Sequence, residues 1–122
     1  MMFDADKYVL DYQVSPALVE TQILKKAEAI AKKIAVDINL IGILAVEMFL
    51  SKDGSLLVNE LAPRPHNSGH HTIEGNYTSQ FEQHLRSILN LPLGSTDIVI
   101  PSVMINILKT EVVKIKHFLE SV

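Results

Sequence analysis

The sequence predicts an α+β fold, and three observations support this class. Two stretches, 16–38 and 79–90, repeat apolar residues at helical spacing, and 43–61 contains two short apolar runs around an Asp-Gly turn. Amphipathic helices repeat with a period of about 3.6 residues and strands with a period of 2. We therefore expect an antiparallel sheet that carries these two helices on one face.

Composition narrows the class of protein further. The chain has 122 residues, 48% of them hydrophobic, a net charge of −3 and no cysteine. A chain of this size is one domain or part of one, and its acidic balance argues against a nucleic-acid-binding surface. It has no apolar run long enough to span a membrane and no signal-peptide pattern. The absence of cysteine excludes disulfides and is compatible with the reducing cytoplasm, where we expect the protein to act.

The hairpin is the most informative segment. An Asp-Gly pair at 53–54 separates the apolar runs 43–50 and 56–61, and this pair favours a two-residue loop because both residues accept positive φ. With that loop, paired positions add up to 107, which places Glu47 directly opposite Glu60. Facing carboxylates destabilise a sheet unless something compensates them, and their oxygens are preferred ligands of hard cations. We therefore predict a magnesium site; the alternative is that one or both side chains point into solvent.

Capping signals predict where both helices begin. Ser15 followed by Pro16 is a typical start for the helix 16–38, whose apolar stripe would pack on something flat. Ser79 and Glu82 form a capping box at the start of the helix 79–90.

The other segments are expected to be short or irregular. We expect a loop or edge strand at 1–14, a loop at 62–77, a strand interrupted by proline at 98–108 and a last helix at 112–122. The strand 43–50 is apolar on both faces apart from Glu47, which indicates a covered position, and His84 and His117 are expected on the surface. The chain starts in mid-loop and stops after an uncapped helix, which indicates a segment of a longer protein.

The loop that follows the second strand carries side chains typical of a binding site. Arg64 has a planar guanidinium suited to phosphate or carboxylate, and Gly69 lets the backbone approach a ligand closely. His66, Asn67 and Ser68 add short polar groups. Loops at the ends of rigid strands often carry function, and we expect this one to do so.

Two alternatives stay open for this loop. Arg64 could form an ordinary salt bridge with Glu60 or Glu74. A glutamate could bind zinc together with His66, His70 and His71, although the proline and glycine in the loop disfavour the helix that such spacing suits. The chain has no glycine-rich phosphate loop and no lysine near the predicted metal site, so a bound nucleotide would need half of its site from elsewhere.

Several segments together carry a family resemblance. The segments are 46–49, 53–54, 57–70, 78–86, 91–94 and 101–106. They closely resemble the N5-carboxyaminoimidazole ribonucleotide synthetases, also called the ATPase subunit of phosphoribosylaminoimidazole carboxylase, of the ATP-grasp family. The most specific run is Pro-Arg-Pro-His-Asn-Ser-Gly-His at 63–70. The resemblance implies that 1–91 is the C-terminal half of an ATP-grasp domain and that 92–122 begins a small, truncated C-terminal domain.

The resemblance also implies an activity and a metal site. The reaction would be the ATP-dependent carboxylation of 5-aminoimidazole ribonucleotide with bicarbonate in purine synthesis, through carboxyphosphate, by an enzyme that is a homodimer at full length. Glu47 and Glu60 match the family's Mg²⁺ ligands, and Asn59 with Glu60 matches a nucleotide-contacting position. Many other ATP-grasp enzymes have asparagine where this chain has Ala62, which leaves more of the magnesium shell to water and phosphate.

The loop residues receive roles from the same resemblance. Arg64 matches the arginine that steadies the transferred phosphoryl group, and His66 and Asn67 match residues of the bicarbonate and aminoimidazole pocket. The rest of the substrate loop is Ser68, Gly69 and His70. The rivals are an enzyme like the formate-dependent glycinamide ribonucleotide transformylase, which has Asp-Thr at 67–68, and a non-catalytic metal-binding or interaction fragment. We expect the isolated chain to be inactive.

Overall fold

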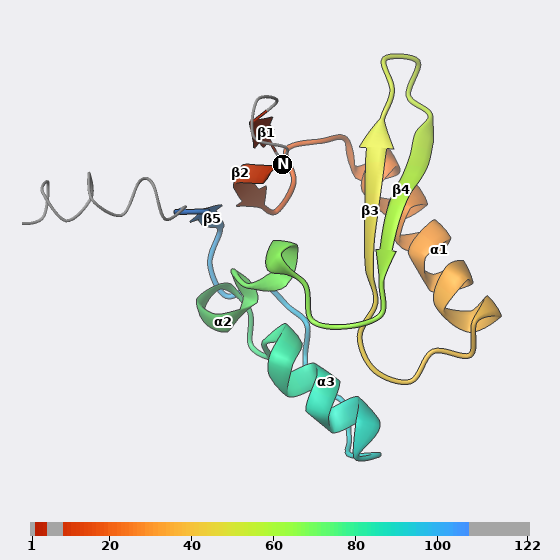
Figure 1. Ribbon diagram of the computed structural model, residues 1–122, viewed down its shortest axis with the longest axis vertical. Coiled ribbons are helices and arrows are strands. Elements are labelled where there is room, and N and C mark those ends of the chain that lie inside the picture. Colours follow the sequence, from red (N-terminus) through yellow and green to blue (C-terminus); the bar gives the residue numbers. More distant parts are fainter. Residues whose placement is uncertain (1, 5–8, 108–122) are drawn as a thin grey trace, which may run out of the picture.

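The computed structural model describes residues 2–4 and 9–107 of the chain (Figure 1). In chain order the elements are β1 (Met2–Asp4), β2 (Val9–Ser15), α1 (Thr21–Asp37), β3 (Ala45–Leu50), β4 (Leu56–Ala62), the 3₁₀ helix η1 (Asn67–Gly69), α2 (Thr72–Gly75), α3 (Gln80–Ile88) and β5 (Ser102–Ile105). Helices and antiparallel strands occur together, which confirms the predicted α+β class. The last helix expected at 112–122, with His117, lies outside the described residues.

The described strands form two antiparallel sheets. One has the order β1-β2-β5, and the other is the hairpin β3-β4. The prediction of a loop or edge strand at 1–14 is wrong for β2, which is the central strand of its sheet. One side of β2 pairs with β1 and the other with β5, from Tyr12 opposite Ile105 to Ser15 opposite Ser102. The strand predicted at 98–108 is shorter than expected, since β5 begins only after Pro101.

The turn of the hairpin differs from the predicted one. Ser51 N–H donates to Ser55 O at 2.9 Å, so the loop has the three residues 52–54, with Gly54 at φ +81°. Asp53 caps this turn by accepting hydrogen bonds from Ser55, which lower the pKa of Asp53. The two-residue loop is therefore a wrong prediction.

A β-bulge corrects the register farther along the hairpin. Next to the turn, the residue numbers of two paired residues add up to 106, as in Leu50 opposite Leu56. The register then shifts between Glu47 and Met48, where β4 has the additional residue Asn59. Beyond the bulge the sum is 107, and Glu47 is the partner of Glu60. The predicted pairing is confirmed, although by a different route from the one expected.

Helix α1 begins later than predicted and covers one face of the hairpin. The helix starts at Thr21 rather than at residue 16, because Ser15 still belongs to β2 and a residue before proline prefers an extended backbone. Its apolar side lies against the face of β3 formed by Val46, Met48 and Leu50, with a groove of ≈ 400 Å³ between them. The expected cover on both faces of β3 is not found in the described part of the chain, because Phe49, on the opposite face, is exposed.

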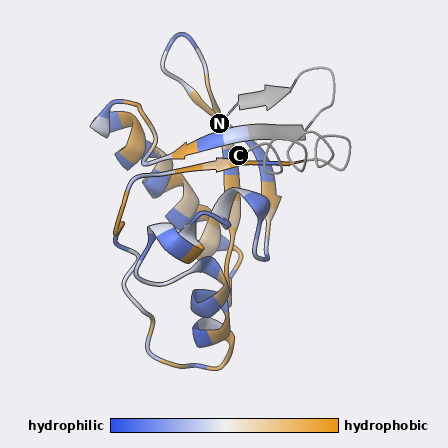
Figure 2. Ribbon diagram, turned by 90° about the vertical axis from the view of Figure 1, so that its left-hand side faces the viewer, coloured by the Kyte–Doolittle hydropathy of each residue, from blue (hydrophilic) through white to orange (hydrophobic). Residues whose placement is uncertain are grey.

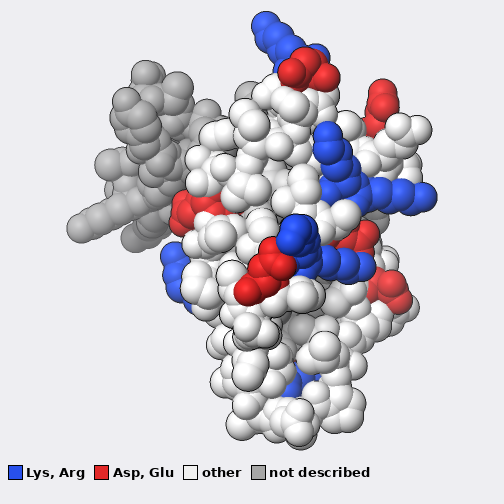
Figure 3. Space-filling view, turned by 90° about the vertical axis from the view of Figure 1, so that its right-hand side faces the viewer, with Lys and Arg blue, Asp and Glu red and all other residues white. Residues whose placement is uncertain are grey.

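The outer side of α1 carries charges of both signs. Figure 3 shows positive and negative side chains interspersed on this side of the molecule. Two i,i+4 ion pairs of 2.7 Å join residues of α1, Lys32 with Glu28 and Lys33 with Asp37. Such exposed pairs contribute little to stability.

Helix α3 holds the segment that leads into β3. One half of the predicted capping box is present, since Ser79 Oγ accepts a hydrogen bond from Glu82 N–H at 3.2 Å. The Glu82 carboxylate accepts from Arg86 Nε at 2.8 Å. His84 was expected on the surface, but it is half-buried and its Nδ1 accepts a hydrogen bond from Ile43 N–H at 3.2 Å. The expectation failed because the preceding loop folds back onto this face of the helix, where Ser87 also accepts from Gly42 N–H.

Burial in the described residues is modest. Ala62 is the buried hydrophobic residue, whereas Gln13, Thr78 and Gln80 are buried polar residues. Figure 2 shows hydrophobic and hydrophilic residues alternating along the helices, as the predicted amphipathic pattern requires. Within the described ranges, no helix has both the length and the apolar character needed to cross a membrane.

Candidate functional site

The two glutamates of the hairpin form the centre of the candidate site. Glu47 on β3 and Glu60 on β4 are directly paired, and their side chains therefore leave the same face of the hairpin. Glu47 is largely covered, with 14% of its side chain exposed, while Glu60 is exposed. The nearest basic group recorded for Glu47 is His66, whose Nδ1 lies 3.8 Å from Glu47 Oε1. An imidazole offsets the negative charge only when it is protonated.

A cleft opens along the edge of β3 beside these residues. Its volume is ≈ 500 Å³, and among its lining residues are Glu47, Asn59 and Ser68. Asn59, the bulge residue and the predicted nucleotide-contacting position, thus lines the same cleft as Glu47 and the loop residue Ser68. The carboxylate oxygens are the ligand type that Mg²⁺ prefers, and two of them leave other coordination positions to water or phosphate.

Arg64 lies at the start of the loop and is free to reach a ligand. Its side chain is exposed, and its guanidinium donates a hydrogen bond to the carbonyl of Pro65 at 3.0 Å. Neither Glu60 nor Glu74 forms an ion pair with it in the part of the chain that the structure describes. The alternative of an ordinary salt bridge at Arg64 therefore has no support here.

The middle of the loop folds into η1 rather than remaining irregular. His66 caps this short helix, because its Nδ1 accepts from Ser68 N–H at 3.4 Å and lies 2.9 Å from Ser68 Oγ. Asn67 and Gly69 are half-buried within the same turn. The loop prediction for 62–77 missed both η1 and α2, since each is so short that its periodicity is not visible in the sequence.

Two buried glutamines hold the loop, and neither was among the site residues predicted from the sequence. Gln80 on α3 bonds to both backbone groups of His66, at 2.9 and 2.8 Å. Gln13 on β2 donates from Nε2 to Ser68 O at 2.6 Å, and the same nitrogen lies 2.7 Å from His71 Nδ1. In the sequence Gln13 stands between Tyr12 and Val14 and Gln80 between Ser79 and Phe81, and neither setting identifies a partner.

The histidines do not assemble into a zinc site. His66 faces Glu47, whereas His70 turns toward α3 and stacks on Phe81 with ring centroids 5.4 Å apart. His71 turns instead toward Gln13. No group of three metal-ligating side chains occurs among the residues described, so the zinc alternative is not supported.

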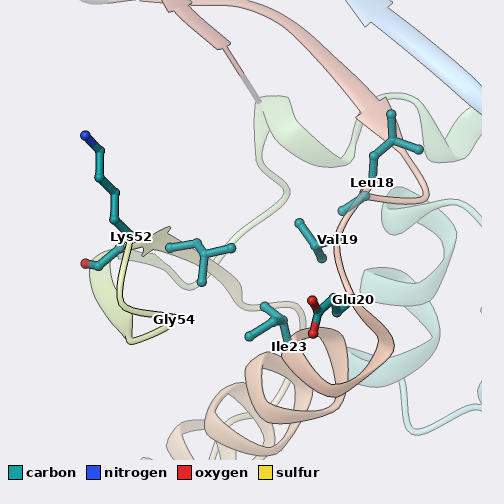
Figure 4. A pocket seen from close by; sticks show the side chains of 9 residues that line it. Leu18, Val19, Glu20, Ile23, Lys52 and Gly54 are labelled. Carbon is teal, nitrogen blue, oxygen red and sulfur yellow. The ribbon is translucent and has the colours of Figure 1, made fainter.

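A larger cavity lies away from these residues, in another part of the described chain. It has a volume of ≈ 790 Å³ and is located between the start of α1 and the tip of the hairpin. Figure 4 shows mainly apolar side chains around it, with Lys52 extending away from them. None of the predicted site residues lines it, and we do not place the candidate site there.

Comparison with known proteins defines the family. A model of the ATP-grasp domain matches residues 4–81, which is more than half of the chain. The chain therefore belongs to the ATP-grasp family.

Within this family, its similarity is to the N5-carboxyaminoimidazole ribonucleotide synthases. The chain is 57% identical over 104 residues to the Bacillus subtilis protein of that name, a match that covers 85% of this chain and 27% of the relative. A second relative, from Aquifex aeolicus, is 54% identical over 85 residues, or 70% of this chain and 23% of the relative.

Solved structures agree with this assignment. The N5-carboxyaminoimidazole ribonucleotide synthetase of Thermotoga maritima has a TM-score of 0.78 at 55% identity, covering 80% of this chain and 27% of that one. The Aspergillus clavatus enzyme, in complex with ADP and 5-aminoimidazole ribonucleotide, has a TM-score of 0.85 at 38% identity over 98% of this chain and 33% of that one. The chain thus spans about a quarter to a third of the length of these relatives.

Proposed function

We propose that this chain supplies one half of the active site of an N5-carboxyaminoimidazole ribonucleotide synthetase. The reaction is the ATP-dependent carboxylation of 5-aminoimidazole ribonucleotide with bicarbonate in purine synthesis. The observation that carries the proposal is the pairing of Glu47 with Glu60 directly before the loop that begins at Arg64. The identity to the Bacillus subtilis synthase supports the same reaction rather than a formate-dependent transformylase.

In this proposal Glu47 and Glu60 hold Mg²⁺. Bound Mg²⁺ neutralises charge on the nucleotide phosphates, which is the main requirement of phosphoryl transfer. The donor set fits the ion, since two facing carboxylates supply hard oxygen ligands and lie beside a cleft with room for phosphate. Asn59, which lines that cleft, contacts the nucleotide.

The loop residues bind and orient the reacting groups. Arg64 stabilises the transferred phosphoryl group, for which its exposed guanidinium is available, since it forms no ion pair with the described residues. His66 and Asn67 form part of the pocket for bicarbonate and the aminoimidazole. Ser68, Gly69 and His70 shape the loop around the substrate.

Several features of the whole protein belong to the same proposal. Residues 1–91 form the C-terminal half of the ATP-grasp domain, and 92–122 begin a small C-terminal domain. The whole enzyme is a cytoplasmic homodimer, and its remaining nucleotide-binding groups come from outside this chain. The chain by itself therefore turns over no ATP.

An exchange experiment tests the proposal. This chain replaces the segment of the Bacillus subtilis synthase that it matches, and the product is called the hybrid enzyme. We expect the hybrid to carboxylate 5-aminoimidazole ribonucleotide in the presence of ATP, Mg²⁺ and bicarbonate, and the Glu47→Gln and Glu60→Gln hybrids to lose this activity. Glu28→Gln, an exposed carboxylate on α1, is the matched control. A folded hybrid without carboxylation, or active Glu47 and Glu60 variants, would contradict the proposal.

A further inference from the structure

Gln80 is a buried polar side chain with three partners in the substrate loop. It is the first residue of α3 and is 8% exposed. Its Oε1 accepts a hydrogen bond from the N–H of His66 at 2.9 Å, and its Nε2 donates to the carbonyl of the same residue at 2.8 Å. Nε2 also lies 2.8 Å from Nδ1 of His70. One amide therefore satisfies both backbone polar groups of His66 and orients a second imidazole.

The polarity of these contacts leaves one arrangement. The backbone N–H of His66 can only donate and its carbonyl can only accept, which sets the orientation of the Gln80 amide. The Nε2 of Gln80 can only donate, so Nδ1 of His70 accepts this hydrogen bond. The proton of the His70 ring then lies on the other ring nitrogen, His70 Nε2. Gly69 packs against the same amide, since a Cβ there would lie 2.6 Å from Gln80 Cδ. The loop and Gln80 are thus closely fitted to each other.

The backbone of His66 determines where the proposed site residues lie. The side chain of His66 lies 3.8 Å from Glu47 and 2.9 Å from Ser68 Oγ. Arg64 and Asn67 are within two residues of it. A displacement of the His66 backbone would therefore move all of the loop groups that are proposed to contact the substrates.

We infer that Gln80 is a positioning residue, which holds the substrate loop at the distance from Glu47 and Glu60 that the reaction requires. It acts through His66 and touches no substrate itself. The inference rests on the proposed function, because the role of the loop in the reaction belongs to that proposal. A misplacement of reacting groups by about 1 Å can cost on the order of 10²-fold in rate, so a loosened loop should be visible in kcat.

A second glutamine on α3 provides a matched control. Gln83 makes the same double hydrogen bond to a loop backbone, since its Oε1 accepts from Gly94 N–H at 2.9 Å and its Nε2 donates to Gly94 O at 2.8 Å. In the chain Gly94 lies between α3 and β5, outside the substrate loop. A substitution of Gln83 removes the same kind of interaction and leaves His66 in place.

The experiment compares three variants of the hybrid enzyme: Gln80→Met, Gln80→Glu and Gln83→Met. The measurements are kcat, the KM for ATP and the midpoint of thermal unfolding. We expect Gln80→Met to lower kcat on the order of 10²-fold, with the KM for ATP changed by less than about twofold. Gln80→Glu should lie between this variant and the parent, because a carboxylate still accepts from His66 N–H. Gln83→Met should lower the unfolding midpoint about as much as Gln80→Met but change kcat by less than about threefold.

The outcomes separate this inference from the proposed function. A folded but inactive parent hybrid counts against the proposed function. An active parent with Gln80→Met at full kcat, or with Gln83→Met equally impaired, overturns the positioning role. If Gln80→Met does not fold, Gln80→Glu decides, and a kcat equal to that of the parent then overturns the inference.

Discussion

Glu60→Gln should change the stability of the hybrid enzyme in opposite directions with and without Mg²⁺. Glu47 and Glu60 are direct cross-strand partners on one face of the hairpin. Without a cation, the pair places two negative charges side by side, and replacing Glu60 by an amide of the same shape removes this repulsion. With a cation, the same change removes a ligand.

The pairing seen in the structure, with general cross-strand geometry, gives the size of the repulsion, and mass action gives the size of the cation's effect. Directly opposed cross-strand side chains have Cβ atoms about 5 Å apart, at which two unit charges repel by about 0.8 kcal/mol in water and about 3 kcal/mol at an effective dielectric constant near 20. Glu60 is exposed, which favours the lower value. Ligand binding at one hundred times Kd stabilises the native state by about 2.7 kcal/mol, so the effect of the cation should exceed the repulsion.

Thermal unfolding in EDTA measures the repulsion between the two glutamates, and thermal unfolding in Mg²⁺ with ADP measures the stabilisation by the bound cation. We expect Glu60→Gln to raise the unfolding midpoint by about 1–3 °C in EDTA. In Mg²⁺ with ADP, the midpoint of the variant should be lower than that of the parent enzyme. Glu28→Gln is the control, because it breaks an exposed ion pair with Lys32 and should lower the midpoint slightly under both conditions. A Glu60→Gln variant that is less stable in EDTA, or that Mg²⁺ stabilises as much as the parent, would refute the reasoning.

Three further predictions concern the loop and α3. Arg64→Ala in the hybrid should lower kcat about 10³-fold or more, by analogy with arginine fingers, with little change in unfolding because the side chain is exposed; near-normal turnover would remove its assigned role. Gly69→Ala should displace the Gln80 amide and reproduce the kcat loss of Gln80→Met, whereas unchanged kcat would show that the loop adapts. Ser79→Ala removes the hydroxyl that caps α3 by accepting from Glu82 N–H, and it should lower the free energy of unfolding by about 1 kcal/mol in denaturant while kcat stays unchanged. An unchanged denaturation midpoint would contradict the role of the cap.

The hairpin illustrates how a correct pairing can be predicted from incomplete reasoning. The Asp-Gly pair correctly indicates a turn, but the loop has three residues, and this alone would place Glu47 opposite Asn59. The bulge at Asn59 shifts the register back by one residue and pairs Glu47 with Glu60. Bulges depend on packing around a strand more than on its own residues, and the sequence pattern contained no sign of this one.

The sequence by itself determined the features that neighbouring residues control. The Ser79 cap, the polar and apolar sides of α1 and the turn after β3 each depend on residues a few positions apart. Such interactions form wherever the local pattern allows them, because few other residues compete for the same groups. The specific run at 63–70 also indicated the family without any coordinates.

Only the tertiary structure decided how the loop is held. Gln13 meets Ser68 across 55 positions, and Gln80 meets His66 across 14, so neither partner could be identified from spacing. A glutamine side chain has two donor hydrogens and an acceptor oxygen that can pair with any nearby backbone group, and its partner is selected when the surrounding elements pack. For the same reason His84 became a half-buried hydrogen-bond acceptor rather than a surface residue, once the loop before β3 folded against α3. The position of the candidate site residues therefore follows from long-range packing, because the energy of a buried hydrogen bond depends on which groups the fold removes from water together.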